Sequence, residues 1–149
     1  MDRQHPRDLF DVMQLFAHEG VTTDIRRAFV VYLASHNRPV HEVLFPSLKD
    51  IRFDYEHNFE GMTAEPVSLD DLVVTRGRLI DERQRGLDSA ERGFLLSLVA
   101  AEPDWTLLDM PHIEHLPAIR WKLQNLEKLK KADTARFTHQ YETLGRLLA

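Results

Sequence analysis

The sequence predicts an all-α fold of six to eight short-to-medium helices in one irregular bundle. Apolar residues recur at helical spacing along nearly the whole chain, and N-capping residues or prolines precede most of these segments. No run of β-branched residues alternates over five or more positions between turn signals, so no strand is predicted. Because 149 residues suit one domain, we expect residues 1–149 to form a single helical domain.

Four helices are predicted in the first half of the chain, over about residues 8–18, 24–36, 39–44 and 48–59. Their ends are marked by prolines, cap residues and glycines, namely Pro6, Gly20, Thr22 or Thr23, Pro39 and Gly61. The spacing predicts that the second helix turns Ile25, Ala28, Phe29 and Tyr32 inward. The fourth is predicted to turn Leu48, Ile51, Tyr55 and Phe59 inward.

Four more helices are predicted in the second half. Ser68 with Asp71, and Asp88 with Glu91, have the spacing of capping boxes, each ahead of an apolar periodic segment. Pro117 opens a further helix, and Asp133 can cap the last one. The least regular stretch, residues 102–116, is predicted to be an ordered loop.

The composition excludes several classes of protein. The absence of cysteine rules out disulfides, zinc–thiolate sites and a cysteine nucleophile. A net charge of −5 argues against non-specific nucleic-acid binding by the domain as a whole, although a local basic face is compatible with it. The apolar stretches are far shorter than the roughly 20 residues that span a bilayer, and the N-terminus lacks an apolar signal region. We therefore expect a cytoplasmic protein without a membrane partner.

Three patterns that could carry chemistry are incomplete. His112 and His115 flank Glu114 at a metal-ligand spacing, but they lie in the predicted loop without an obvious third ligand. Asp54 and Glu56 resemble a two-magnesium carboxylate pair, which needs a strand to hold both on one face. A helix separates them by about 200°.

An acid–base pair of His36 and Glu42 would lack a nucleophile and an orienting partner. The sequence therefore predicts no catalytic residue and no metal site.

Two polar stretches and one cationic cluster are further candidates for a binding site. Arg7, Asp8 and Asp11 begin an otherwise apolar helix, where capping explains Asp8 but not the arginine beside it. Residues 35–42 are dense in donors and acceptors between two apolar helices, which is compatible with a capped turn or a binding loop. Lys122 and Asn125 lie three apart within a cationic segment. That segment is a solvated helix face or a phosphate-facing patch.

Several blocks occur together in a characteristic order: Asp2-Arg3-Gln4-His5-Pro6-Arg7-Asp8-Leu9-Phe10-Asp11, Ser35-His36-Asn37-Arg38-Pro39, Phe59-Glu60-Gly61-Met62-Thr63, Glu102-Pro103-Asp104-Trp105 and Trp121-Lys122-Leu123-Gln124-Asn125-Leu126. This set resembles the C-terminal half of the AbiEii/AbiGii family of nucleotidyltransferase toxins. The resemblance implies a transferase with a strand-rich N-terminal core, where a Gly-Ser element and an Asp-x-Asp pair hold magnesium and a nucleoside triphosphate. It also implies a role as the toxin of a toxin–antitoxin or abortive-infection system.

The chain has no Gly-Ser followed by Asp-x-Asp, so the resemblance implies a truncated helical part, inactive alone. Magnesium and nucleotide are then expected only if a transferase core is supplied. The expected partners are the missing N-terminal half, a cognate antitoxin or a second copy. By resemblance, the residues expected to line the family's cleft are Arg7, Asp8, Asp11, Lys122 and Asn125. The alternative is a free-standing helical protein–protein interaction module.

Overall fold

The computed structural model describes residues 4–149, which form eight α-helices and two short 3₁₀-helices and contain no strand. The α-helices are α1 (Pro6–His18), α2 (Thr23–Ser35), α3 (Val40–Leu44), α4 (Arg52–Asn58), α5 (Leu69–Arg85), α6 (Ser89–Val99), α7 (Pro117–Ala132) and α8 (Thr134–Leu148). The 3₁₀-helices are η1 (Trp105–Leu107) and η2 (Pro111–His115). The predicted all-α class is confirmed. No helix in this part of the chain is both long and apolar enough to span a membrane.

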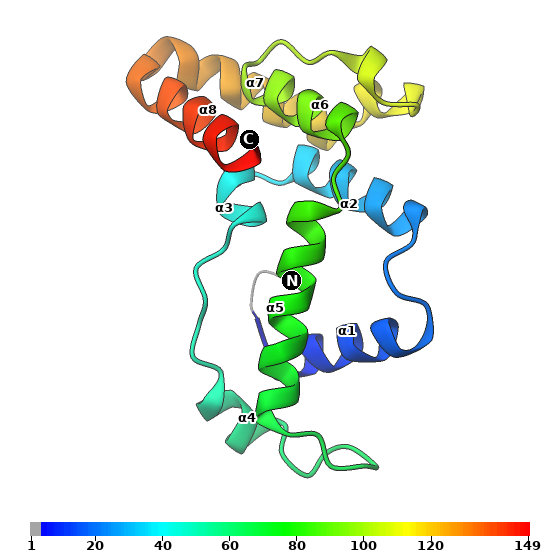
Figure 1. The fold of residues 1–149 in the computed structure, drawn as a ribbon. Helices are drawn as coiled ribbons and strands as arrows, with labels where there is room; N and C mark the ends of the chain where they lie inside the picture. Colours follow the sequence, from blue (N-terminus) through cyan, green and yellow to red (C-terminus); the bar gives the residue numbers. More distant parts are fainter. Residues whose placement is uncertain (1–3) are drawn as a thin grey trace.

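Two hydrophobic clusters, joined by α5, form the core. The larger cluster packs α2, α3, α6, α7 and α8 around buried residues such as Leu33, Phe94 and Leu98. The smaller cluster consists of Leu9, Ile51, Phe59 and Leu72, where α1 and α4 meet the beginning of α5. Figure 1 shows α5 running from the end that carries α1 and α4 to the end that carries α2 and α6.

The locally encoded helix ends are confirmed. At α5 and α6, both halves of each capping box are present, Ser68 with Asp71 and Asp88 with Glu91. Gly20, with φ 73°, follows the end of α1 and adopts the left-handed conformation that glycine permits at low cost.

The fourth helix begins later than predicted. Residues 46–51 are not helical, and α4 begins at Arg52, whose backbone N–H donates to the Asp50 carboxylate at 3.0 Å. The short polar side chain of Asp50 thus forms a local turn that competes with helix formation. Leu48, predicted to face inward, is 65% exposed, so that prediction is wrong.

The second helix buries only part of the predicted face: Ile25 and Phe29 are half-buried, and Phe29 packs against the larger cluster. Val30, Leu33 and Ala34 enter the larger cluster, whereas Ala28 is exposed and Tyr32 is 37% exposed. Apolar residues cover more than one stripe of α2, so periodicity alone could not identify the core-facing stripe.

Residues 102–116 are ordered, as predicted, but they contain the two 3₁₀-helices. Ile113 of η2 is buried in the larger cluster, and Trp105 of η1 lies against Phe94 with ring centroids 5.6 Å apart. These two apolar anchors explain why a proline-containing connection holds one conformation.

Arg92 ties the α5–α6 junction to the end of the chain. Its guanidinium donates to three backbone carbonyl oxygens, those of Gln84 (3.0 Å), Leu87 (3.0 Å) and Leu148 (2.8 Å). Carbonyls at the ends of α5 and α8, which lack helical partners, are thereby satisfied.

Candidate functional site

The N-terminal end of α1 places Arg7 and Asp8 beside a polar hollow. His5 and Asn58 line it with them, and its volume is about 350 Å³. His5 caps α1 by accepting the backbone N–H of Arg7 at its Nδ1, 3.2 Å away. The guanidinium of Arg7 contacts the Met62 sulfur at 3.6 Å. The structure therefore brings Arg7 and Asp8 to one site between α1 and the end of α4.

Asp11 is exposed one turn farther along α1 and does not line that hollow. Asp8 and Asp11 nevertheless share a helix face with Val12 and Leu15, because positions 8, 11, 12 and 15 have the i, i+3, i+4, i+7 spacing. This face of α1 is acidic near its beginning and apolar near its end.

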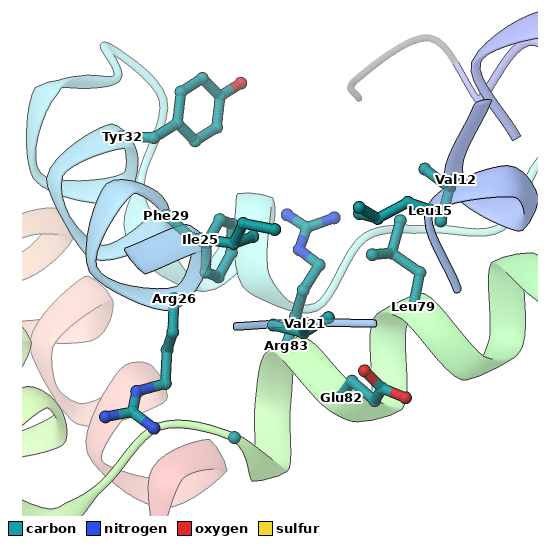
Figure 2. A pocket seen from close by; sticks show the side chains of 11 residues that line it. Val12, Leu15, Val21, Ile25, Arg26, Phe29, Tyr32, Leu79, Glu82 and Arg83 are labelled. Carbon is teal, nitrogen blue, oxygen red and sulfur yellow. The ribbon is translucent and has the colours of Figure 1, made fainter. Parts of the chain in front are cut away.

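The apolar end of that face lines a groove formed by α1, α2 and α5, with a volume of about 310 Å³. The residues around it are Val12, Leu15, Val21, Ile25, Arg26, Phe29, Tyr32, Leu79, Glu82, Arg83 and Gly86. Figure 2 shows Ile25 and Phe29 from α2 facing Val12 and Leu15 from α1, with Arg83 of α5 between them. The Arg83 guanidinium lies over the Phe29 ring, 4.5 Å from its centroid.

Lys122 is not on a solvated face. It is 6% exposed, and its ammonium group donates to the backbone carbonyl oxygens of His36 and Arg38, the latter at 3.0 Å. Burial lowers the pKa of Lys122 from 10.5 to about 8, because the charged form loses hydration. Asn125, by contrast, is exposed.

The five residues expected by resemblance to line a cleft therefore lie in two places. Arg7, Asp8 and Asp11 belong to α1, whereas Lys122 and Asn125 belong to α7. Helices α1 and α7 lie at opposite ends of the molecule (Figure 1). Lys122 is a structural partner of the turn at residues 36–38, the same turn that stood out as dense in donors and acceptors.

The candidate metal ligands do not assemble. Within residues 4–149, no three side chains of His, Asp or Glu are grouped so that they could hold a metal ion. His112 and His115 are exposed on η2, and Asp54 and Glu56 lie on α4. Since the described residues contain no such group, we assign no step of a metal-dependent reaction to them.

One buried polar network escaped the sequence reasoning. The Gln4 side chain donates to the Ser47 carbonyl oxygen (2.8 Å) and accepts from the Lys49 backbone N–H and from Arg76, both at 3.1 Å. Arg76 also donates to the Lys49 carbonyl oxygen at 2.6 Å. The bonded partners lie 27 to 72 positions apart, so no local pattern in the sequence indicates them.

The comparisons with known proteins identify the family. No curated protein and no solved structure matches the chain. The family model "Nucleotidyl transferase AbiEii toxin, Type IV TA system" matches residues 1–125. That range includes Arg7, Asp8, Asp11, Lys122 and Asn125, whereas α8 lies beyond it. Because the match covers most of the 149 residues, the chain belongs to the AbiEii family of nucleotidyl transferase toxins.

Proposed function

We propose that this chain is the helical accessory region of an AbiEii-type nucleotidyltransferase toxin, acting with a transferase core that supplies magnesium and the nucleoside triphosphate. The observation that carries the proposal is the family match over residues 1–125, of which residues 4–125 consist of helices and their connections. The sequence resemblance implies that the family's nucleotide and metal are held by strands. In this proposal the chain has no transfer activity alone.

In this proposal the transferase core binds along the face of α1 that carries both aspartates. Asp8 and Asp11 continue directly into Val12 and Leu15, which line the apolar groove. A polypeptide partner seated in the groove would therefore lie against both carboxylates. Apolar burial in the groove would hold the partner, and Arg7, Asp8 and Asp11 would face the cleft between the two parts.

The test is nucleotide transfer with magnesium and each triphosphate, by the purified chain and by the chain co-expressed with a transferase half of the same family. We expect no incorporation by the chain alone and measurable incorporation by the pair. Asp8→Asn with Asp11→Asn should reduce transfer by the pair. The matched control is Glu56→Gln with Glu127→Gln, at exposed positions outside the groove and the hollow beside Arg7. Robust transfer by the chain alone, abolished by the α1 variants, would overturn the proposal.

The groove itself favours a second candidate function, a free-standing module that binds an antitoxin or a second copy. An apolar groove bordered by polar residues is typical of a protein-binding surface. Ile25→Glu should abolish partner binding under either proposal, whereas Val74→Glu, at a 71% exposed site outside the groove, should not. Restored transfer on co-expression separates the two, because only the accessory region predicts it. A uniformly monomeric chain that captures neither antitoxin nor core would contradict the module.

A further inference from the structure

A second groove lies along a side of α5 that the proposed function does not use. It is formed by α5 and the segment that leads from α3 to α4, which passes along α5 in Figure 1, and its volume is about 360 Å³. We call it the Gly77 groove, and it is lined by Pro46, Leu48, Val73, Arg76, Gly77 and Ile80. None of these residues lines the groove between α1, α2 and α5.

Apolar side chains form the walls of the Gly77 groove and continue onto the surface. Val73, Gly77 and Ile80 share one face of α5, because positions 73, 77 and 80 have helical i, i+4, i+7 spacing. Val73 is 40% exposed, and Leu48 on the opposite wall is 65% exposed. Large apolar side chains that are exposed around one groove are typical of a surface that another molecule covers.

The charged side chain in the lining is a buried arginine. Arg76 is 7% exposed, and its Nη1 group donates to Gln4 Oε1 at 3.1 Å and to the Lys49 carbonyl oxygen at 2.6 Å. Both acceptors are uncharged, and Arg76 forms no ion pair with any described residue. Its Nε and Nη2 groups donate to no described residue, and both are accessible to solvent. Because buried charges are normally paired, a carboxylate is the group that this groove lacks.

Gly77 is a second feature that indicates an occupant. It lies inside α5 in ordinary helical conformation, where glycine is less stable than alanine. A Cβ atom at this position would meet no atom within 4 Å, so the packing of the described residues does not require a glycine here. The missing side chain does allow the backbone of another segment to approach α5 closely.

We propose that the Gly77 groove binds a polypeptide segment of another protein, in which an aspartate or glutamate lies between apolar side chains. The carboxylate accepts from Nε and Nη2 of Arg76 as paired donors, the arrangement in which guanidinium and carboxylate groups bind most strongly. The apolar side chains of the segment cover Leu48 and Val73. Small-ligand sites enclose most of their ligand, whereas this groove is open at both of these residues, so a polypeptide fits it better than a small acid.

The groove is formed before any segment arrives. Gln4 bonds the backbone of Ser47 and Lys49, and Arg76 bonds the backbone of Lys49 as well, so these contacts hold the two walls together. Preformed walls lower the entropic cost of binding. The site does not depend on the proposed function, because a chain that never transfers a nucleotide would still present it.

The test is a subtractive selection of peptides. A phage library of random dodecapeptides is first depleted on the Gly77→Leu variant, whose leucine fills the groove, and is then selected on the wild-type chain. We expect the enriched peptides to share an acidic residue flanked by apolar residues. The matched control, Ala135→Leu, adds a leucine at an exposed helical position outside the groove and should bind every enriched peptide. Circular dichroism shows whether each variant folds, and Val73→Glu serves for the depletion if Gly77→Leu does not.

Binding of an enriched peptide is then measured by fluorescence polarisation. Gly77→Leu should weaken binding about tenfold or more, and replacing the acid of the peptide by its amide should have an effect of similar size. The amide peptide tests the pairing with Arg76 from the side of the ligand, so this measurement requires no variant of a buried residue.

Three results would overturn the proposal. The first is that no peptide distinguishes the wild-type chain from the variant with a filled groove. The second is that the acidic peptide and its amide form bind equally well. The third is a different occupant, shown either by decanoate that displaces the labelled peptide at a lower concentration than unlabelled peptide does, or by dimerisation of the wild type that Gly77→Leu abolishes.

Discussion

The ammonium group of Lys122 donates to the backbone carbonyl oxygen of Arg38 across 84 positions of sequence. A second bond, to the His36 carbonyl oxygen, completes the contact between α7 and the turn that joins α2 to α3. From the sequence, Lys122 could lie on a solvated helix face or in a phosphate-facing patch. In the structure it is buried and anchors the backbone of this turn.

Replacing Lys122 by methionine should lower the free energy of unfolding by about 1–3 kcal/mol at pH 7. Methionine keeps an unbranched stem of similar length but leaves two carbonyl oxygens without this donor. Urea denaturation measures the change. The control Lys131→Met, at an exposed position of the same helix, should change stability by less than about 0.5 kcal/mol. Equal stability of wild type and Lys122→Met would show that the anchor contributes nothing.

The same residue predicts a pH dependence. Its folded-state pKa is about 8 and its ordinary value is 10.5, so between these pH values the unfolded chain binds more protons than the folded chain. Stability of the wild type relative to Lys122→Met should therefore rise as pH increases from 8 to 10.5, by on the order of 1–3 kcal/mol. Below pH 8 the difference should be flat.

The neutral amine keeps two N–H donors, enough for both carbonyl oxygens, so deprotonation need not open the turn. Urea titrations of both proteins at several pH values provide the test. A difference that falls between pH 8 and 10.5 would contradict the lowered pKa.

Replacement of the buried acid Glu91 should destabilise the fold. One carboxylate oxygen accepts from Arg26 Nε at 2.9 Å and the other from the Asp88 backbone N–H at 3.1 Å, and the side chain is 6% exposed. Glu91→Ala removes the ion pair and half of the capping box, so we expect a loss of about 2–3 kcal/mol in thermal or urea unfolding. Glu127→Ala, at an exposed site on α7, is the control.

A double-mutant cycle with Arg26→Ala isolates the ion pair, whose coupling energy we expect to be about 1 kcal/mol. Strict additivity of the two single variants would mean that the effect of Glu91 comes from the cap alone.

Gln4→Ala should loosen the segment that leads into α4. Gln4 has φ 50°, a left-handed conformation that costs a non-glycine residue roughly 1–2 kcal/mol, and its three side-chain hydrogen bonds offset that strain. Without them, the Lys49 amide should exchange with deuterium about ten times faster or more. Gln14→Ala, at an exposed position on α1, should leave that exchange unchanged. Unaltered exchange in Gln4→Ala would mean that Arg76 alone fixes the segment.

What the sequence could predict follows from the range of each interaction. The capping boxes of Ser68 and Asp88 involve partners three positions away, and both are present as predicted. Asp50 also acts locally, but the apolar spacing of Leu48 and Ile51 predicts a helix from about residue 48, whereas α4 begins at Arg52.

Long-range contacts explain the features of the fold and of the candidate site that could not be predicted from the sequence. The carbonyl partners of Lys122 and the Gln4–Arg76 bond join positions 84, 86 and 72 residues apart, and such pairings leave no periodic trace. Three of the four residues predicted to face inward on α2, namely Ile25, Phe29 and Tyr32, line the groove between α1, α2 and α5, because a helix that contacts both a core and a groove is apolar on two faces. A polar hollow of about 450 Å³ likewise depends on Arg38, Lys49 and Arg83 meeting from separate segments.

Arg83 belongs to two cavities: it lines the apolar groove between α1, α2 and α5 and also the polar hollow of about 450 Å³ between α3, α5 and the segment leading into α4. It therefore acts as a shared wall, stacked on Phe29 and bonded to the backbone of α3. A ligand that displaces this side chain on one side reshapes the site on the other. Any ligand of the groove and any ligand of the hollow would then be linked by one reciprocal coupling free energy through Arg83.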